Sequence, residues 1–255
     1  MTPLSLAALT LIFFATALVT VVTGSTTLIT VPVMLQFGIE PRTAVATNML
    51  ALTWLSFGGA LPFLRTTAID RPRVPVLTAL TLAGSAAGAL LLFTVPARWM
   101  TLIIPVAMVA VAAVLLFDPA AELVPPSQLR ARSGYAVMAL LSVYGGFLSG
   151  GYATLVTAAG ILFFRYPLLR AIAMSRLLNT ASSLIAVAVF AHYGIIDWRL
   201  GAILSAAAFA GGVLGTHWAR KMPSALLRRL FLGAVAVLAL KSLIFDVPWK
   251  ELVAA

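Results

Sequence analysis

The sequence contains no cysteine, which excludes disulfide bonds, thiolate metal sites and any thiol relay. Charged residues are also scarce, because Asp, Glu, Lys and Arg make up 9% of the 255 residues, whereas soluble domains carry about 25%. Hydrophobic residues make up 62% and the mean hydropathy is +1.08. These proportions exclude a soluble domain and indicate an all-α polytopic membrane protein, expected in the cell inner membrane.

Acidic residues and histidines are few, and they lie in loops, at segment ends or near the termini. An intramembrane enzyme would need paired aspartates, a Ser-His pair or facing metal ligands inside the spans, and the sequence shows none, so an enzyme is not expected. His192 and His217 have no partner at ligand spacing, so no metal or other cofactor is expected. Asp70 and Asp197 lie just before an arginine at a loop-to-helix junction and are expected to cap helices. The seven carboxylates are Glu40, Asp70, Asp118, Glu122, Asp197, Asp246 and Glu251.

The net charge of +10 comes from basic residues that are scattered singly between apolar runs. This distribution is typical of topology anchors that face anionic lipid, and no nucleic-acid partner is expected. The first apolar stretch, 4–22, lacks a basic leading region and a small-residue cleavage site, and the next apolar run follows at once. It is expected to be part of the mature fold rather than a signal peptide.

The sequence is internally duplicated. A shift of 127 residues without a gap aligns Gly24 with Gly151, and likewise aligns further identical glycine, aspartate and proline residues. Such matches indicate duplication rather than shared composition, and they divide one transmembrane domain into a first repeat (1–117), a linker (118–133) and a second repeat (134–255). The apolar segments lie at 4–22, 26–37, 42–64, 74–94 and 99–117, and again at 134–148, 152–164, 168–190, 200–217 and 230–246.

The second segment of each repeat, 26–37 or 152–164, is too short to span, because about 20 helical residues cross the hydrocarbon core. Each follows a break, TGSTT or SGGYAT, where glycine and hydroxyl side chains can turn the backbone. Two arrangements are possible. If the first two segments of each repeat form a re-entrant hairpin that returns to its starting side, the repeats are inverted. If these two segments together form one broken crossing of the membrane, the repeats are parallel.

Basic residues favour the inverted arrangement. It places eleven of them on one face and four on the other, whereas parallel repeats split the same fifteen into seven and eight. We therefore predict two inverted repeats, each a re-entrant or broken helix pair plus three transmembrane helices, with both termini outside the cytoplasm. The face with four carries Arg42, Arg98, Arg199 and Lys250. The other face carries Arg65, Arg71, Arg73, Arg130, Arg132, Arg165, Arg170, Arg220, Lys221, Arg228 and Arg229.

Arg176 is a lone cation within the apolar run from Pro167 to Phe190. A cation at that depth costs at least about 2.5–3.5 kcal/mol on insertion scales, so a compensating partner is expected. No carboxylate is available at that depth, and the first hypothesis is therefore a transported anion. Arginine suits a sulfonate or carboxylate, because its planar fork donates parallel hydrogen bonds and stays charged. The alternative is a structural Arg176 that snorkels or binds carbonyls exposed at a helix break.

Inverted repeats would bring the two breaks together near the bilayer midplane, where helix N-termini favour anions. Polar residues of the third segment of each repeat are expected at a similar depth, and Arg176, Asn179 and Ser183 can share a helix face. The alternative is that the small residues only allow close helix packing. The residues expected at the breaks are Gly24, Ser25, Thr26, Thr27, Gly150, Gly151, Tyr152, Ala153 and Thr154. Those expected from the third segments are Thr47, Asn48, Ser175, Arg176 and Asn179. Elsewhere, Gly84, Gly88, Gly211 and Gly215 predict packing faces, either between helices of one chain or across a homodimer.

Several motifs carry a family resemblance. They are GSTTLITVPVML and PRTAVATNMLA in the first repeat, with GGFLSGGYATLV, LLRAIAMSRLLNTASSLIA, YGIIDWRL and GGVLGTHWARKMP in the second. Through them the chain resembles the sulfite exporter TauE/SafE family of bacterial membrane proteins over nearly its whole length. Members typically show a denser glycine cluster in the first turn and a Thr-Ser pair in the next segment. Here these positions read Gly24-Ser25-Thr26-Thr27, Thr47-Asn48 and Met174-Ser175.

The resemblance implies export of sulfite or a small organosulfonate such as sulfoacetate from the cytoplasm. Relatives that take up thiosulfate depend on cysteines, which this chain lacks. The expected partners are a small organic or inorganic anion and the lipid bilayer. Because no buried carboxylate or histidine can relay protons, uniport or proton movement with the substrate is expected. The alternatives are a transporter or channel for another small carboxylate or oxyanion, and a membrane subunit that transports nothing.

Overall fold

The computed structural model describes residues 3–24, 26–64, 66, 68–94, 128–147, 149–223, 225–227, 229–230 and 233. The regular elements in these ranges are all helices, as predicted. The first half contains α1 (Pro3–Thr23), α2 (Thr27–Gln36), α3 (Pro41–Ala60), the 3-10 helix η1 (Leu61–Phe63) and α4 (Val74–Leu91). The second half contains α6 (Gln128–Phe147), α7 (Tyr152–Phe164), α8 (Leu168–His192) and α9 (Trp198–Lys221). The predicted segment 99–117 and nearly all of 230–246 lie outside the described residues.

Five of the described helices are long and apolar enough to cross a membrane. Two of them, α3 and α9, begin at a capping side chain. Pro41 opens α3 behind Glu40, whose carboxylate accepts from the Thr43 N–H at 2.8 Å. The Asp197 carboxylate caps α9 by accepting from the Leu200 N–H at 3.0 Å, as predicted. Helix α6 begins at Gln128, inside the stretch 118–133 that the sequence predicts to link the repeats, and the division into repeats stays a prediction.

The same 127-residue offset relates backbone geometry in the two halves. Gly24 (φ +79°) and Gly151 (φ +77°) are left-handed at the two breaks, a conformation that costs other residues about 1–2 kcal/mol. The Asp70 N–H donates to Met174 Sδ at 3.4 Å, and the Asp197 N–H donates to Thr47 Oγ1 at 3.1 Å. The offset pairs both the two donors and the two acceptors, so each half makes the same contact to the other half.

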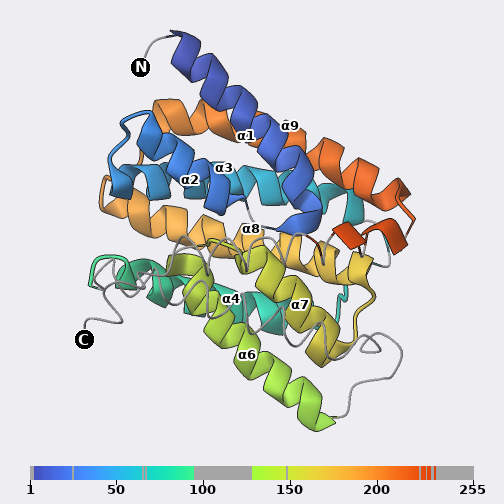
Figure 1. The fold of residues 1–255 in the computed structure, drawn as a ribbon. Coiled ribbons are helices and arrows are strands. Elements are labelled where there is room, and N and C mark those ends of the chain that lie inside the picture. Colours follow the sequence, from blue (N-terminus) through green and yellow to red (C-terminus); the bar gives the residue numbers. More distant parts are fainter. Residues whose placement is uncertain are drawn as a thin grey trace, which may run out of the picture.

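The fold is built around α8, which crosses its middle with α1, α2, α3 and α9 on one side and α4, α6 and α7 on the other (Figure 1). The last described helix of each half packs on the opposite half: α4 lies against α6 and α8, and α9 lies against α1 and α3. The two central helices, α3 and α8, run antiparallel, since Gly59 lies by Arg176 at one end and Met49 clusters with Phe190 at the other.

Glycines allow these helices to approach closely. A Cβ atom added at Gly88 of α4 would lie 1.9 Å from the Val143 carbonyl oxygen of α6. A Cβ atom at Gly215 of α9 would lie 2.4 Å from the Leu18 carbonyl oxygen of α1. The predicted glycine faces therefore serve packing within the chain, which is one of the two uses that the sequence left open. A homodimer stays a prediction.

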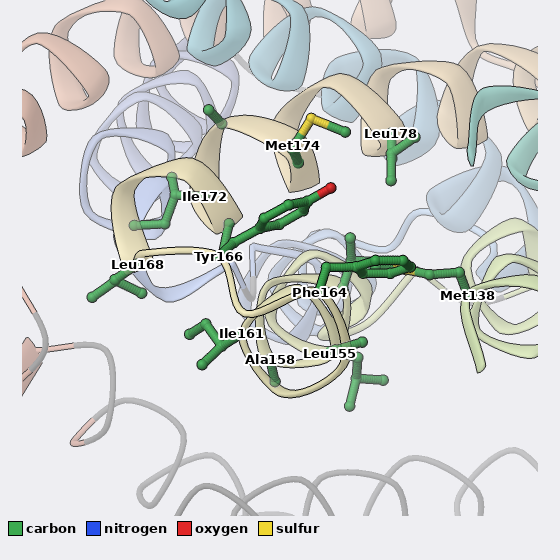
Figure 2. Packing of buried hydrophobic residues seen from close by; sticks show 14 of the residues in the cluster. Met138, Leu155, Ala158, Ile161, Phe164, Tyr166, Leu168, Ile172, Met174 and Leu178 are labelled. Carbon is green, nitrogen blue, oxygen red and sulfur yellow. The ribbon is translucent and has the colours of Figure 1, made fainter. Parts of the chain in front are cut away.

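The largest apolar cluster joins α6, α7 and α8 to the loop before α4 (Figure 2). Phe164 at the end of α7 stacks on Tyr166 with 5.6 Å between ring centroids. Met138 of α6 and Met174 of α8 belong to the same cluster. Since the cluster includes Tyr166, the link between α7 and α8 is itself part of the core.

Candidate functional site

The two helix breaks meet. Gly24 lies between α1 and α2, and a Cβ atom added there would lie 2.6 Å from the Thr154 backbone nitrogen and 3.0 Å from the Ala153 carbonyl carbon. Gly151 precedes α7, and the Tyr144 hydroxyl donates to the Gly150 carbonyl oxygen. The predicted break residues Gly24, Ala153 and Thr154 are therefore in one place, whereas Ser25 lies outside the described residues.

The break in the first half is held by threonine side chains on both sides of it. Thr20 and Thr26 form a hydroxyl–hydroxyl hydrogen bond of 2.7 Å across the break. The Thr20 carbonyl oxygen accepts from the Gly24 N–H at 2.7 Å. Hydroxyl groups thus satisfy polar atoms where the helix is interrupted, which a membrane interior requires.

Arg176 is 2% exposed and reaches the end of α1 from the middle of α8. Its Nη2 donates to the carbonyl oxygens of Thr20 at 2.6 Å and Val21 at 2.9 Å. A cation at this place also stabilises the negative end of the α1 dipole. One of the structural roles considered for Arg176 was binding to carbonyl oxygens at a helix break. Its Nη2 forms these hydrogen bonds. The buried Nε has no hydrogen-bond partner among the described residues.

Asn179 lies one turn beyond Arg176 and is also buried. Its Nδ2 donates to Ser56 Oγ at 2.6 Å, which ties α8 to α3. Its Oδ1 is buried without a partner in the described part of the chain. Ser183, which was predicted to share this face, donates to the Asn179 backbone carbonyl oxygen instead. Arg176 and Asn179 thus each keep one buried polar atom without a partner in the described part of the chain.

The other residues predicted from the third segments form hydrogen bonds within the protein. The Asn48 Oδ1 accepts from Thr30 at 2.7 Å and its Nδ2 donates to Thr27 at 3.2 Å, so Asn48 anchors α2 to α3. Thr47 accepts from the Asp197 N–H. Ser175 donates to the Ile172 carbonyl oxygen at 2.9 Å within its own helix.

Comparison with known proteins agrees with this architecture. A family model described as sulfite exporter TauE/SafE matches residues 9–242. The chain belongs to the TauE/SafE family. It is 25% identical to a probable membrane transporter protein of Haemophilus influenzae, over 96% of each chain. It is also 25% identical to the probable membrane transporter protein YfcA of Escherichia coli K12, over 98% of this chain and 93% of that one. No solved structure matches it.

Membership of the TauE/SafE family, together with the apolar helices, makes this chain a membrane transporter and a multi-pass protein of the inner membrane. Three of the motifs that carry the resemblance lie at the site. GSTTLITVPVML and GGFLSGGYATLV form the two breaks, and LLRAIAMSRLLNTASSLIA is most of α8. In this TauE/SafE protein the motif residues thus lie where the helices are interrupted and along the helix that passes them.

Sequence reasoning missed a second polar cluster beside the first turn of α7. The buried Ser85 hydroxyl lies 2.7 Å from Ser182 Oγ and donates to the Ser142 carbonyl oxygen at 2.9 Å. Ser142 Oγ in turn lies 3.3 Å from Thr81 Oγ1. Single serines and threonines in apolar helices carry no signal of their own, so only the packing of α4, α6 and α8 brings them together. In the TauE/SafE fold of this chain they supply interhelical hydrogen bonds.

The prediction that Asp70 caps a helix is wrong. The residue at the N-cap position of α4 is Arg73, and the Asp70 side chain instead accepts from Arg73 Nη1 at 2.5 Å and from the Tyr166 hydroxyl at 2.6 Å. Burial opposes ionisation of Asp70, but hydrogen bonds from Tyr166 and Arg73 and the positive charges of Arg73 and Arg170 outweigh it, so the pKa of Asp70 is lowered. Asp70 therefore remains an ionised partner of Arg73.

Proposed function

We propose that this transporter exports a small sulfur-containing anion, sulfite or an organosulfonate such as sulfoacetate, from the cytoplasm. The observation that carries the proposal is the buried guanidinium of Arg176 beside the meeting point of the two breaks. Its two carbonyl partners accept hydrogen bonds but leave its net charge in place. Among the described residues no carboxylate forms an ion pair with Arg176.

A buried cation without a counter-ion is costly, and a small anion in contact with it recovers part of that cost. The unused Nε N–H of Arg176 supplies a charge-assisted donor to an oxyanion. The first turn of α7 lies beside Gly24, and the positive end of a helix dipole adds a favourable field for negative charge. The free Oδ1 of Asn179 is an acceptor, so it suits a water or an ammonium group on the ligand.

The antiparallel packing of α3 and α8 supports the inverted arrangement of the repeats, because these helices correspond at the 127-residue offset. Inverted repeats place a substrate site near the midplane, where either side of the membrane can reach it in turn. An inside-negative potential favours exit of an anion by about 2.3 kcal/mol per charge per 100 mV. Export by uniport, or with a proton carried on the substrate, therefore needs no side-chain proton relay.

The test is binding of sulfite, sulfoacetate, taurine, sulfate and acetate to the purified protein, measured by calorimetry. We expect Arg176→Gln, which keeps a donor for the carbonyls, to weaken binding of the preferred sulfonate or sulfite about 10- to 100-fold, the loss typical of a charged hydrogen bond. Arg176→Lys keeps the charge but loses the planar fork, so it is expected to be intermediate.

Arg220→Gln is the matched control. Arg220 also donates to a carbonyl oxygen, that of Pro62 at 2.9 Å, but at the exposed surface. Its replacement is expected to leave binding unchanged. Equal affinity in the wild-type protein and both Arg176 variants would overturn the proposal. Binding of acetate alone would show that the substrate is a carboxylate and not a sulfur-containing anion.

A further inference from the structure

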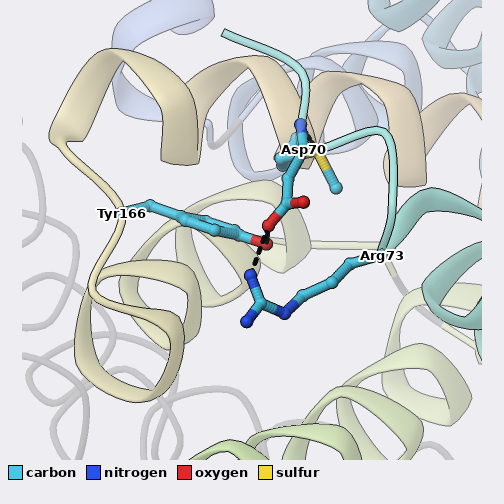
Figure 3. A network of polar contacts seen from close by, with 4 residues as sticks. Asp70, Arg73 and Tyr166 are labelled. Atoms are coloured by element: carbon cyan, nitrogen blue, oxygen red, sulfur yellow. Dashed lines mark hydrogen bonds and ion pairs between the residues drawn. The ribbon is translucent and has the colours of Figure 1, made fainter. Parts of the chain in front are cut away.

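The loop before α4 and the link between α7 and α8 are joined by three polar side chains (Figure 3). Asp70 Oδ2 accepts from both Arg73 and Tyr166, and Tyr166 lies 96 residues away in the other half of the chain. The Asp70 side chain is 9% exposed and Tyr166 is 2% exposed, so water competes little for their hydrogen bond, whereas the Arg73 side chain is 34% exposed. Burial and the Asp70 charge raise the pKa of Tyr166, which therefore stays a donor.

Apolar contacts hold this network in place. The Arg73 guanidinium lies 5.5 Å from the ring centroid of Phe164, and that ring stacks on Tyr166. The Asp70 N–H points to Met174 of α8, which lies in the same cluster (Figure 2). Met174 is itself buried and is two residues before Arg176. The network therefore lies against the first turns of α8, in the same half of the helix as Arg176.

The other half of the molecule has no such network among its described residues. The 127-residue offset pairs Tyr166 with Ile39 and Arg73 with Leu200, neither of which can form a polar bridge. The aspartate is present as Asp197, but its carboxylate caps α9. One end of the duplicated fold is thus closed by polar side chains, and the corresponding place at the other end lacks them.

We propose that Asp70, Arg73 and Tyr166 form a gate lock that closes the access to Arg176 from this end of the transporter. The inference rests on the transport function, because alternating access requires the two repeats to move against each other around a central site. Asp70 and Tyr166 belong to different repeats, so opening this end breaks their hydrogen bond. The lock lies among Arg71, Arg73, Arg165 and Arg170, on the face that the sequence predicts to be cytoplasmic.

The natural absence of cysteine allows a direct test. Met174→Cys places a single thiol on α8 beside Asp70. Its reaction with a membrane-impermeant maleimide is followed in right-side-out and everted membrane vesicles. Tyr166→Phe removes only the hydroxyl and keeps the stacked ring. We expect it to speed labelling of position 174 from one side about tenfold, the order of change for losing a hydrogen bond to a charged group. Asp70→Asn is expected to act in the same direction.

The matched control uses the other half. Thr47→Cys occupies the position that corresponds to Met174, and Tyr166→Phe is expected not to speed its labelling. Unchanged labelling at position 174, or an equal rise at positions 174 and 47, would overturn the lock. The labelling needs no substrate, so a rise at position 174 combined with unaltered anion binding by the Arg176 variants would keep the lock and reject the sulfur-anion proposal.

Discussion

Arg176 donates a hydrogen bond of 2.6 Å to the Thr20 carbonyl oxygen, and so joins the middle of α8 to the end of α1, 156 residues earlier in the chain. The same oxygen accepts from the Gly24 N–H. The buried cation is thereby fixed to the interruption between α1 and α2. An anion that binds this guanidinium therefore acts on the place where the helix is broken.

This double role predicts that stability and anion binding can be separated at Arg176. Arg176→Ala removes the guanidinium donor from the Val21 carbonyl oxygen and leaves the Thr20 oxygen with the Gly24 N–H, and we expect it to cost about 1–3 kcal/mol of stability. Arg176→Gln retains a donor and relieves the burial of charge, so it is expected to unfold at a temperature no lower than the wild type. The unfolding temperatures of both variants and of the wild-type protein are measured in detergent. Equal losses of stability in the two variants would contradict the carbonyl role.

Gly24 is predicted to be intolerant of any side chain. Gly24→Ala adds a left-handed strain and places Cβ 2.6 Å from the Thr154 nitrogen, so a loss of about 2–4 kcal/mol and of transport is expected. Gly38→Ala is the control, because Gly38 has the same φ of +79° but nothing within 4 Å of the added Cβ. Its free energy of unfolding should fall only by the strain of the left-handed conformation, about 1–2 kcal/mol. Similar losses in both variants would show that the two breaks are not in contact.

The hydrogen bond from Asn179 to Ser56 is predicted to couple the two central helices. A double-mutant cycle with Asn179→Ala and Ser56→Ala should give a coupling energy of about 0.6 kcal/mol, and at most about 2, as found for such bonds in membranes. The control cycle pairs Asn179→Ala with Ser85→Ala, whose hydroxyl bonds Ser182 and Ser142 instead. Additive effects in the Asn179–Ser56 cycle would contradict the contact.

The two aspartates that correspond at the offset are predicted to respond differently to amidation. Asp197→Asn keeps an acceptor for the Leu200 N–H, and asparagine caps helices about as well as aspartate, so little change is expected. Asp70→Asn removes the charge that faces Arg73 and is expected to lower the unfolding temperature clearly. The same measurement on Asp197→Ala should show the loss of the cap, about 0.5–2 kcal/mol.

The pH dependence of the Asp70 contribution follows from its lowered pKa, set by Tyr166, Arg73 and Arg170 around it. A group whose pKa is lower in the folded state stabilises fully above its unfolded pKa, about 3.9, and loses that contribution as the pH falls through the lower folded value. The difference in unfolding temperature between wild type and Asp70→Asn should therefore stay constant from about pH 8 to about pH 5. A difference that disappears near pH 6 would indicate a lock released by protons.

The sequence by itself determined the class, the helices and their interruptions, because these depend on composition and local chain geometry. Long apolar runs can only be helices in lipid, and Gly24 and Gly151 mark the breaks since a left-handed turn favours glycine. The family resemblance was also visible, and so was the lone cation Arg176, for which an apolar run predicts a partner. The match of the family model to residues 9–242 agrees with that resemblance.

Only the tertiary structure decided which atoms meet. Asp70 looked like a helix cap, and its bond to Tyr166 could not be predicted because the two lie 96 residues apart and depend on how the halves dock. Asn48 was predicted as an anion ligand, and only the structure shows that its amide forms hydrogen bonds with Thr27 and Thr30. The physical reason is the same in both cases. A polar side chain buried in an apolar environment takes the nearest partner that packing offers, and packing brings together residues from both halves of the chain.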